Sequence, residues 1–193
     1  AGAHALEQCA SFHCQSELPC SEILSQLRMH LPEDIGVLSC EEAPPRFHAR
    51  LNAKAKTYEY RVWNSPEPCV FQRKYWYRLP VHLNLEAMQA AAAHLVGEHD
   101  FRSFCSNKKM KKSTVRTIYS LDVAVMGPEL RFTVRGNGFL YNMVRILVGT
   151  LLEVGMGRRS PAEIPGILEA QNREVAGYTV PAQGLFLMEV EYP

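Results

Sequence analysis

The residue with the clearest chemical potential in this sequence is a single arginine. Arg145 interrupts an apolar stretch from Gly136 to Gly155, in which leucine and valine side chains recur at helical spacing. A guanidinium on an apolar face is costly unless a carboxylate, a phosphate or a set of carbonyls meets it. Arg145 therefore either holds a polar or anionic group or extends along the helix flank to reach solvent.

A second set of candidates combines aromatic and basic side chains. Residues 57–63 alternate and are rich in aromatics, which predicts a strand with Tyr58 and Tyr60 on one face. The cations that precede this strand include Arg50, Lys54 and Lys56. An aromatic face beside cations can stack bases and hold phosphates. Two core tyrosines with satisfied hydroxyls would give the same pattern.

The densest run of positive charge is the segment SNKKMKK at residues 106–112. Its lysines are Lys108, Lys109, Lys111 and Lys112. The run separates a predicted helix from a predicted strand, so we expect an exposed loop. Such a loop either contacts nucleic-acid phosphates or only improves solubility.

Composition argues against several classes of protein. The 193 residues are 47% hydrophobic, which is enough for one sizeable core. The net charge is only +1, so any nucleic-acid surface has to be a local patch. No charge-free apolar run reaches the length of about 18 residues that a membrane span needs. The sequence also lacks a glycine-rich phosphate loop, a G-x-S-x-G motif and an H-E-x-x-H motif.

The six cysteines give little sign of a metal site or of disulfides. Their spacing is irregular and includes no C-x-x-C pair. A zinc cluster of Cys9, His13, Cys14 and Cys20 is conceivable, but structural zinc sites usually have tighter paired spacings. We therefore expect reduced thiols in a cytoplasmic protein, and no bound metal.

Hydrophobic periodicity and capping residues place the secondary structure. Strands are predicted at residues 7–15, 34–40, 57–63, 75–78, 114–125, 129–135 and 184–192. Helices are predicted at residues 21–30, 85–96 and 161–171, with Ser21, Asn84 and Ser160 as N-caps, and within 136–155 after a Gly-Asn-Gly turn. Because hairpins outnumber βαβ units in this order, we predict an α+β fold: a mixed or antiparallel sheet flanked by helices.

Seven stretches in order along the whole chain together resemble the tRNA pseudouridine synthase A family. They are AGAHA (1–5), LPEDI (31–35), FHARLNAKAKTYEY (47–60), GEHDFRSF (97–104), VRTIY (115–119), GNGFLYNMVRILVGTLLEVG (136–155) and QGLFLMEVEYP (183–193). The resemblance implies a pseudouridine synthase-like fold and a cofactor-free isomerase. It implies that the substrate is uridine in the anticodon stem-loop of tRNA, at about positions 38–40. It also implies a homodimer with tRNA as its partner, whereas no association with membranes is expected from the hydropathy described above.

The resemblance assigns roles to individual residues. Tyr58 stacks on the target base and assists proton transfer, Arg145 pairs with the nucleophilic aspartate, and Leu185 packs under the active site. The cations named above, Arg50, Lys54, Lys56, Lys108, Lys109, Lys111 and Lys112, contact the tRNA backbone. In the family the aspartate directly precedes the segment that matches residues 1–5. We therefore expect it before Ala1, with Arg145 close to Ala1, and we expect residues 1–193 alone to be inactive.

The expected organisation is one catalytic domain over residues 1–193 that is incomplete at its N-terminus. Residues 1–45 would remain from its N-terminal half, and residues 46–193 would form its C-terminal half. Two alternatives stay open. One is a non-catalytic RNA-binding module that uses the Tyr58 face and the Lys108–Lys112 loop. The other is a lysine-rich α+β protein with small-molecule or protein partners.

Overall fold

Residues 2–107 and 111–193 are described by a computed structural model. The chain divides into two units, which are described separately. One consists of Ala1–Gln8 and Ala53–Pro193, and the other of Cys9–Asn52. The single catalytic domain expected from the sequence, with its division near residue 45, stays a prediction.

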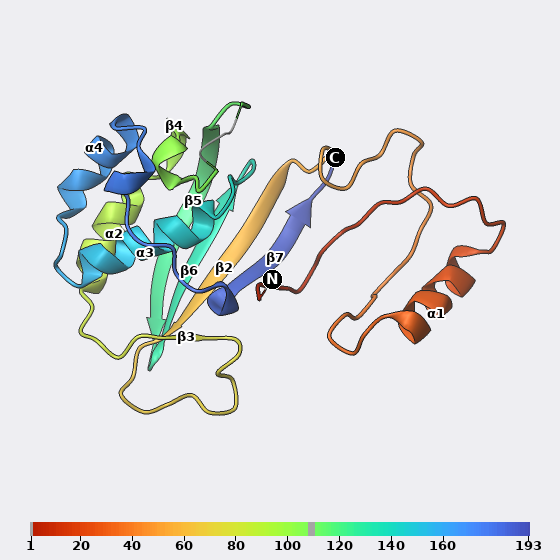
Figure 1. Ribbon diagram of the computed structural model, residues 1–193, viewed down its shortest axis with the longest axis horizontal. Coiled ribbons are helices and arrows are strands. Elements are labelled where there is room, and N and C mark those ends of the chain that lie inside the picture. The colour runs from red at the N-terminus through yellow and green to blue at the C-terminus, as the bar shows by residue number, and fades with distance from the viewer. Residues whose placement is uncertain (1, 108–110) are drawn as a thin grey trace. The chain divides into compact units, whose positions relative to one another are not determined.

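The larger unit is built on a mixed sheet with the strand order β1-β7-β2-β6-β5-β4, and with β3 paired to β2 (Figure 1). The strands are β1 (His4–Ala5), β2 (Ala55–Trp63), β3 (Tyr77–Arg78), β4 (Gly97–Asp100), β5 (Val115–Met126), β6 (Glu129–Gly136) and β7 (Leu185–Glu191). Two pairs, β1 with β7 and β2 with β3, are parallel, and the others are antiparallel. The predicted α+β fold is thereby confirmed.

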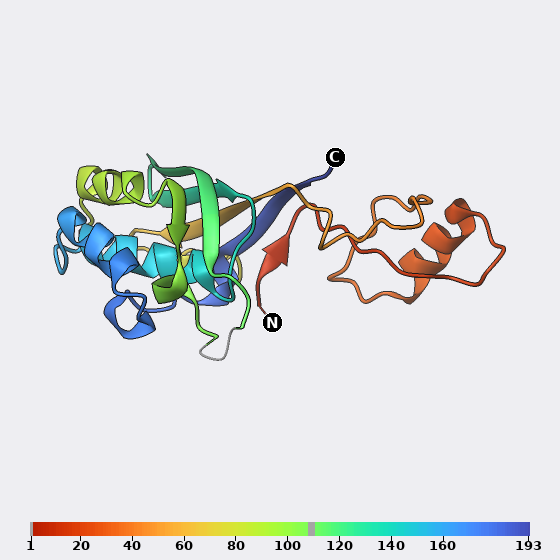
Figure 2. The ribbon, with the colours of Figure 1, turned by 90° about the horizontal axis from the view of Figure 1, so that it is seen from above.

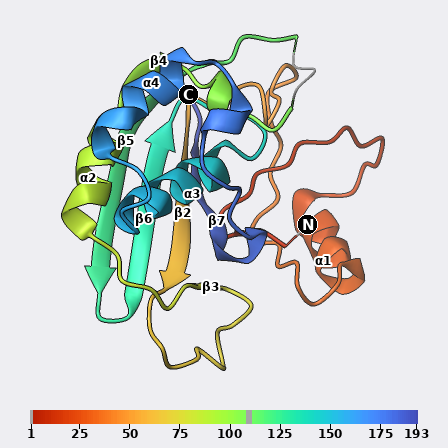
Figure 3. The same cartoon turned by 60° about the vertical axis from the view of Figure 1, so that its left-hand side comes forward.

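Three helices cover one face of this sheet (Figure 3). They are α2 (Leu85–Ala93), α3 (Met143–Gly155) and α4 (Ile164–Glu169), and short 3-10 turns lie at Arg102–Phe104, Pro161–Glu163, Arg173–Val175 and Ala182–Gly184. Helix α3 is buried on all sides except at Arg145 and Glu153. A helix that is apolar all round needs cover on both sides. The sheet supplies one side, and residues 176–181 supply the other.

The smaller unit contains one helix, α1 (Cys20–His30). The Arg28 guanidinium donates to the carbonyl oxygens of Val37 at 2.9 Å and of Leu38 at 3.0 Å. The strands predicted at residues 7–15 and 34–40 are wrong, because both segments are coil in the described chain. Their apolar side chains are largely exposed, and the carbonyls of the second segment bind a side chain instead of a ladder.

Other predicted boundaries shift in ways that local chemistry explains. Ser21 is not a cap, because α1 begins one residue earlier and its N-cap is Pro19. Asn84 does cap α2, where its Oδ1 accepts from the Ala87 amide, and Ser160 forms a capping box with Glu163. The helices predicted at 85–96 and 161–171 are shorter than expected, and β4 was not predicted as a strand.

Two general findings limit the kinds of site that the described residues contain. No described helix has the length and apolar character needed to cross a membrane. Within the same residues, no group of three or more His, Cys, Asp or Glu side chains is placed to hold a metal ion.

Candidate active site

The site forms around Tyr60, which sits in the middle of β2. Tyr60 is fully buried, and its hydroxyl donates to the carbonyl of Pro181 at 2.6 Å. Leu185 is its partner residue on β7. Tyr58 lies two residues earlier on the same face of β2, is half-buried, and meets Phe139 edge to face at a ring distance of 5.2 Å. The strand register thus brings Tyr58 and Leu185 to the same patch of the sheet.

Arg145 reaches this patch from α3. Its Nε donates to the Val180 carbonyl at 2.7 Å, and its Nη1 donates to Oδ1 of Asn142 at 3.0 Å. The guanidinium also lies close enough to the Tyr60 phenol to oppose the rise in that group's pKa. In the part of the chain that the structure describes, Arg145 has no carboxylate partner, and its Nη2 makes no hydrogen bond. A half-buried cation held this way can accept an anion without moving.

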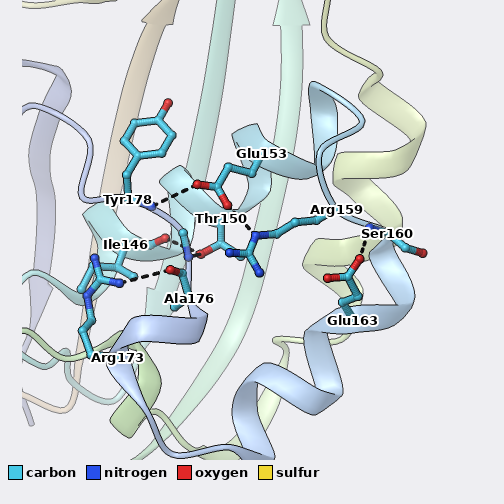
Figure 4. A network of polar contacts seen from close by, with 10 residues as sticks. Ile146, Thr150, Glu153, Arg159, Ser160, Glu163, Arg173, Ala176 and Tyr178 are labelled. Atoms are coloured by element: carbon cyan, nitrogen blue, oxygen red, sulfur yellow. Dashed lines mark hydrogen bonds and ion pairs between the residues drawn. The ribbon is translucent and has the colours of Figure 1, made fainter.

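The segment 176–181, which supplies the Val180 and Pro181 carbonyls, is fastened to the outer side of α3 (Figure 4). The Thr150 hydroxyl donates to the Ile146 carbonyl at 2.8 Å and accepts from the Gly177 amide at 2.9 Å. One turn further along α3, the Glu153 carboxylate accepts from the Tyr178 amide at 3.3 Å. Glu153 is itself paired with Arg159. These contacts fix the carbonyls that orient Arg145 and Tyr60.

Two glycines allow the segment to lie this close to the helix. A Cβ atom at Gly149 would stand 1.9 Å from the carbonyl oxygen of Tyr178, and one at Gly177 would stand 2.6 Å from Cα of Thr150. Both neighbours are backbone atoms, which cannot move aside as the end of a flexible side chain can. Backbone contact between α3 and residues 176–181 therefore requires glycine at both positions.

The start of the chain lies beside β7 and the turn Ala182–Gly184 that precedes it. Strand β1 runs parallel to β7 (Figure 2). Gly2 has a φ of +87°, and a Cβ atom placed on it would stand 3.5 Å from Cβ of Ala182. The His4 ring contacts the rings of Tyr75 and Phe186, each at 4.8 Å, and its Nε2 is 3.1 Å from the Lys74 carbonyl. Ala1 lies outside the described residues, so its expected closeness to Arg145 stays a prediction.

The opposite face of the sheet supports β2 and β7 through charge and stacking. The buried Glu59, between the two site tyrosines, accepts from Nε of Arg61 at 2.6 Å. The Arg61 guanidinium then lies over the Phe186 ring at 3.8 Å. Arg131 on β6 stands 3.8 Å from the same carboxylate. This network joins β2, β6 and β7 beneath the site and makes its floor rigid.

Burial shifts the acid–base behaviour of three phenols near the site. It raises the pKa of Tyr58, and it raises the pKa of Tyr60 further, with the nearby Tyr77 phenol adding to the rise. Burial and a hydrogen bond with Tyr77 raise the pKa of Tyr178 in the same direction. All three phenols are therefore neutral at physiological pH, so Tyr58 can donate a proton but is not a phenolate.

These shifts predict a loss of stability in alkali. Because the folded pKa of Tyr60 lies above its unfolded value of about 10, its neutral form stabilises the fold fully below that pH. The stabilisation declines as the pH rises from there through the folded pKa, by up to about 1.4 kcal/mol per pH unit. Denaturant unfolding of the full-length gene product between pH 8 and pH 11.5 measures this decline in the free energy of unfolding.

Two variants test the assignment of that slope. Tyr60→Phe lowers stability at neutral pH, because it leaves the Pro181 carbonyl unpaired, but it should flatten the alkaline decline. Tyr141→Phe is the matched control, since Tyr141 is 67% exposed. An alkaline decline of equal steepness in wild type and Tyr60→Phe would show that Tyr60 is not its source.

The structure does not gather all the predicted cations at the site. Arg50 belongs to the smaller unit, whereas Lys54 directly before β2 and Lys56 within it belong to the larger one. Lys111 and Lys112 are exposed just before β5. Lys108 and Lys109 lie outside the described residues. The RNA contacts of all these cations stay predictions.

Several groups of the site were not found from the sequence. Asn142 and Phe139 belong to the turn before α3, and the Val180 and Pro181 carbonyls have no side-chain signal. The alternating pattern groups Tyr60 with Tyr58 and indicates no role of its own for Tyr60. Alternation in β2 could have placed Tyr60 in the core, but only the fold shows that its hydroxyl meets the loop that holds Arg145.

Comparison with known proteins first gives a class. Residues 91–193, more than half of the chain, match a family described as tRNA pseudouridine synthase. A chain of a solved Cbf5–Nop10–Gar1 complex aligns with 54% of this chain and 28% of its own length, at 19% identity and a TM-score of 0.32. That similarity is too weak to support an argument.

Relatives narrow the class further. The tRNA pseudouridine synthase A of Brevibacillus brevis is 48% identical over 192 residues, which are 100% of this chain and 79% of that protein. The protein of the same name from Geobacillus kaustophilus is 47% identical over 192 residues, covering 100% of this chain and 74% of that protein. The chain therefore belongs to the tRNA pseudouridine synthase A family, and the resemblance predicted from seven sequence stretches is confirmed.

Proposed function

We propose that the natural protein isomerises uridine to pseudouridine in the anticodon stem-loop of tRNA, at about positions 38–40. The observation that carries this proposal is Arg145, a half-buried guanidinium held by Val180 and Asn142, with no carboxylate partner in the described residues. Such a group can keep a nearby carboxylate ionised in a partly desolvated pocket. In this proposal that carboxylate is the nucleophile, a role that the family relationship supports.

The proposed chemistry is balanced without a cofactor. The N1–C1′ bond of uridine breaks, a C5–C1′ bond forms, and the proton lost from C5 is matched by one gained at N1. An aspartate directly before Ala1 is the nucleophile, Tyr58 stacks on the base and assists the proton transfer, and Leu185 packs below it. The protein works as a cytoplasmic homodimer. Lys54, Lys56, Lys111 and Lys112 contact the tRNA backbone, as do Arg50, Lys108 and Lys109.

The test compares the full-length gene product with residues 1–193 on an unmodified tRNA transcript. We expect pseudouridine in the anticodon stem-loop with the full-length protein, and none with residues 1–193, which lack the proposed nucleophile. Turnover by residues 1–193 would refute the placement of the nucleophile. A full-length protein that binds tRNA with a steep salt dependence but forms no pseudouridine would instead be the RNA-binding module.

A further inference from the structure

Asn142 has an unusual backbone conformation at the start of α3. Its φ is 61° and its ψ is 9°, in the left-handed region. Among the described residues, only one other non-glycine residue, Gln171, has a positive φ. Asparagine tolerates this conformation better than most residues, but the conformation still has a cost. Backbone strain of this kind tends to occur at functional sites.

The Asn142 side chain is not used for the task that its position suggests. Asparagine at a helix N-cap usually accepts a hydrogen bond from one of the first free backbone amides. Asn142 is the N-cap of α3, yet its side chain makes no such bond. The stabilisation that a cap gives is therefore forgone at this helix.

Both the oxygen and the nitrogen of the Asn142 side-chain amide instead make other hydrogen bonds. Oδ1 accepts from Nη1 of Arg145 at 3.0 Å, and Nδ2 donates to the Ser106 hydroxyl at 3.3 Å. Arginine has only donors, so the amide oxygen has to face it. Ser106 is itself held, because its amide donates to the Tyr141 carbonyl at 3.1 Å. Asn142 thus links a fixed loop to the guanidinium.

We propose that Asn142 is a positioning residue that orients Arg145 without neutralising its charge. The inference rests on the proposed function, in which Arg145 pairs with a reacting carboxylate. A neutral amide holds Nη1 in place and leaves the positive charge available. A carboxylate at the same position would pair with Arg145 permanently and compete with the nucleophile. The chemistry therefore requires the amide and disfavours aspartate, its nearest isostere.

The experiment uses three substitutions in the full-length gene product: Asn142→Gly, Asn142→Ala and Asn142→Asp. Glycine keeps the left-handed backbone and removes the amide, so we expect turnover to fall about 10- to 100-fold, the cost of one hydrogen bond to a charged group. Affinity for tRNA should stay within about twofold, because no phosphate contact is lost. Asn142→Ala removes the same amide and should also lower the melting temperature, since alanine is strained at this positive φ.

The Asn142→Asp variant distinguishes a residue that orients Arg145 from one that only fills space. If Asn142 only fills space, Asn142→Asp should be the mildest substitution. The proposal predicts the reverse order, with turnover of Asn142→Asp about 100-fold below wild type or lower, and below that of Asn142→Gly. Gln171→Gly is the matched control, because Gln171 shares the positive φ at 47° and lies outside the site. It should leave turnover unchanged.

The outcomes are distinct. Turnover of Asn142→Gly equal to wild type would overturn the inference, as would turnover of Asn142→Asp at or above that of Asn142→Gly. If Asn142→Asp fails to fold, the glycine variant still decides. A wild-type protein that forms no pseudouridine would refute the proposed function itself, whereas an active wild type with an unaffected glycine variant refutes only the role of Asn142.

Discussion

Arg145→Ala in the full-length gene product should lower pseudouridine turnover by about 1,000-fold, the upper range for loss of one preorganised electrostatic group. The physical reason is that the proposed carboxylate would lose the cation that keeps it ionised. Affinity for tRNA should change little, because Arg145 is held inside the fold by Val180 and Asn142 and is not part of an exposed basic patch. Single-turnover rates and tRNA binding measure the two effects separately.

Salt dependence distinguishes this role from a phosphate contact. If Arg145 binds a backbone phosphate, Arg145→Ala should reduce the slope of log affinity against log salt by about one. We expect the slope to stay unchanged. Arg158→Ala is a matched control, since Arg158 is exposed close to the end of α3. Equal losses in turnover and affinity, with a shallower salt slope, would contradict the ion-pair role.

Gly149→Ala should be among the most destabilising single substitutions in the larger unit. The added methyl group would stand 1.9 Å from the Tyr178 carbonyl oxygen, so α3 and the segment 176–181 have to separate. We expect a loss of about 3 kcal/mol or more in the free energy of unfolding, at or beyond the upper range for overpacking. The protein that still folds should also lose turnover, because the Val180 carbonyl would move away from Arg145.

Gly166→Ala provides the control for this prediction. Gly166 is also helical, in α4, but a Cβ atom there would have no neighbour within 4 Å. Alanine at an open helical position should be neutral or stabilise by about 0.5–1 kcal/mol. Denaturant unfolding of the two variants should therefore give opposite signs. A Gly149→Ala protein as stable as Gly166→Ala would show that the close approach of segment and helix is wrong.

The elements that sequence patterns predicted well are those in which periodicity and burial coincide. Strand β2 alternates because one face meets α3, and the β5–β6 hairpin alternates because one face is buried in the core, where β5 meets α2. Residues 7–15 and 34–40 have strand-like composition but form no ladder, because composition does not supply a neighbouring strand. Tertiary pairing decides whether such short segments become strands.

The sequence predicted only those residues of the candidate site that stand out in a local pattern. Arg145 was visible as a charge in an apolar helix, and Tyr58 as an aromatic on an alternating strand. One of the two groups that hold Arg145 was not visible, because it is the backbone carbonyl of Val180, which lies 35 residues away in the sequence. Local patterns contain no information on such contacts. The strained Asn142 was likewise hidden, since asparagine in a turn is common.

The most direct measurement is an experimental structure of the full-length gene product that resolves the residue directly before Ala1. We predict a carboxylate there, with an oxygen within about 4 Å of the Arg145 guanidinium, the usual limit for an ion pair. Tyr58 and Leu185 should border the same pocket. A residue without a carboxylate at that position, or an Arg145 guanidinium that faces away from it, would contradict the proposed active site.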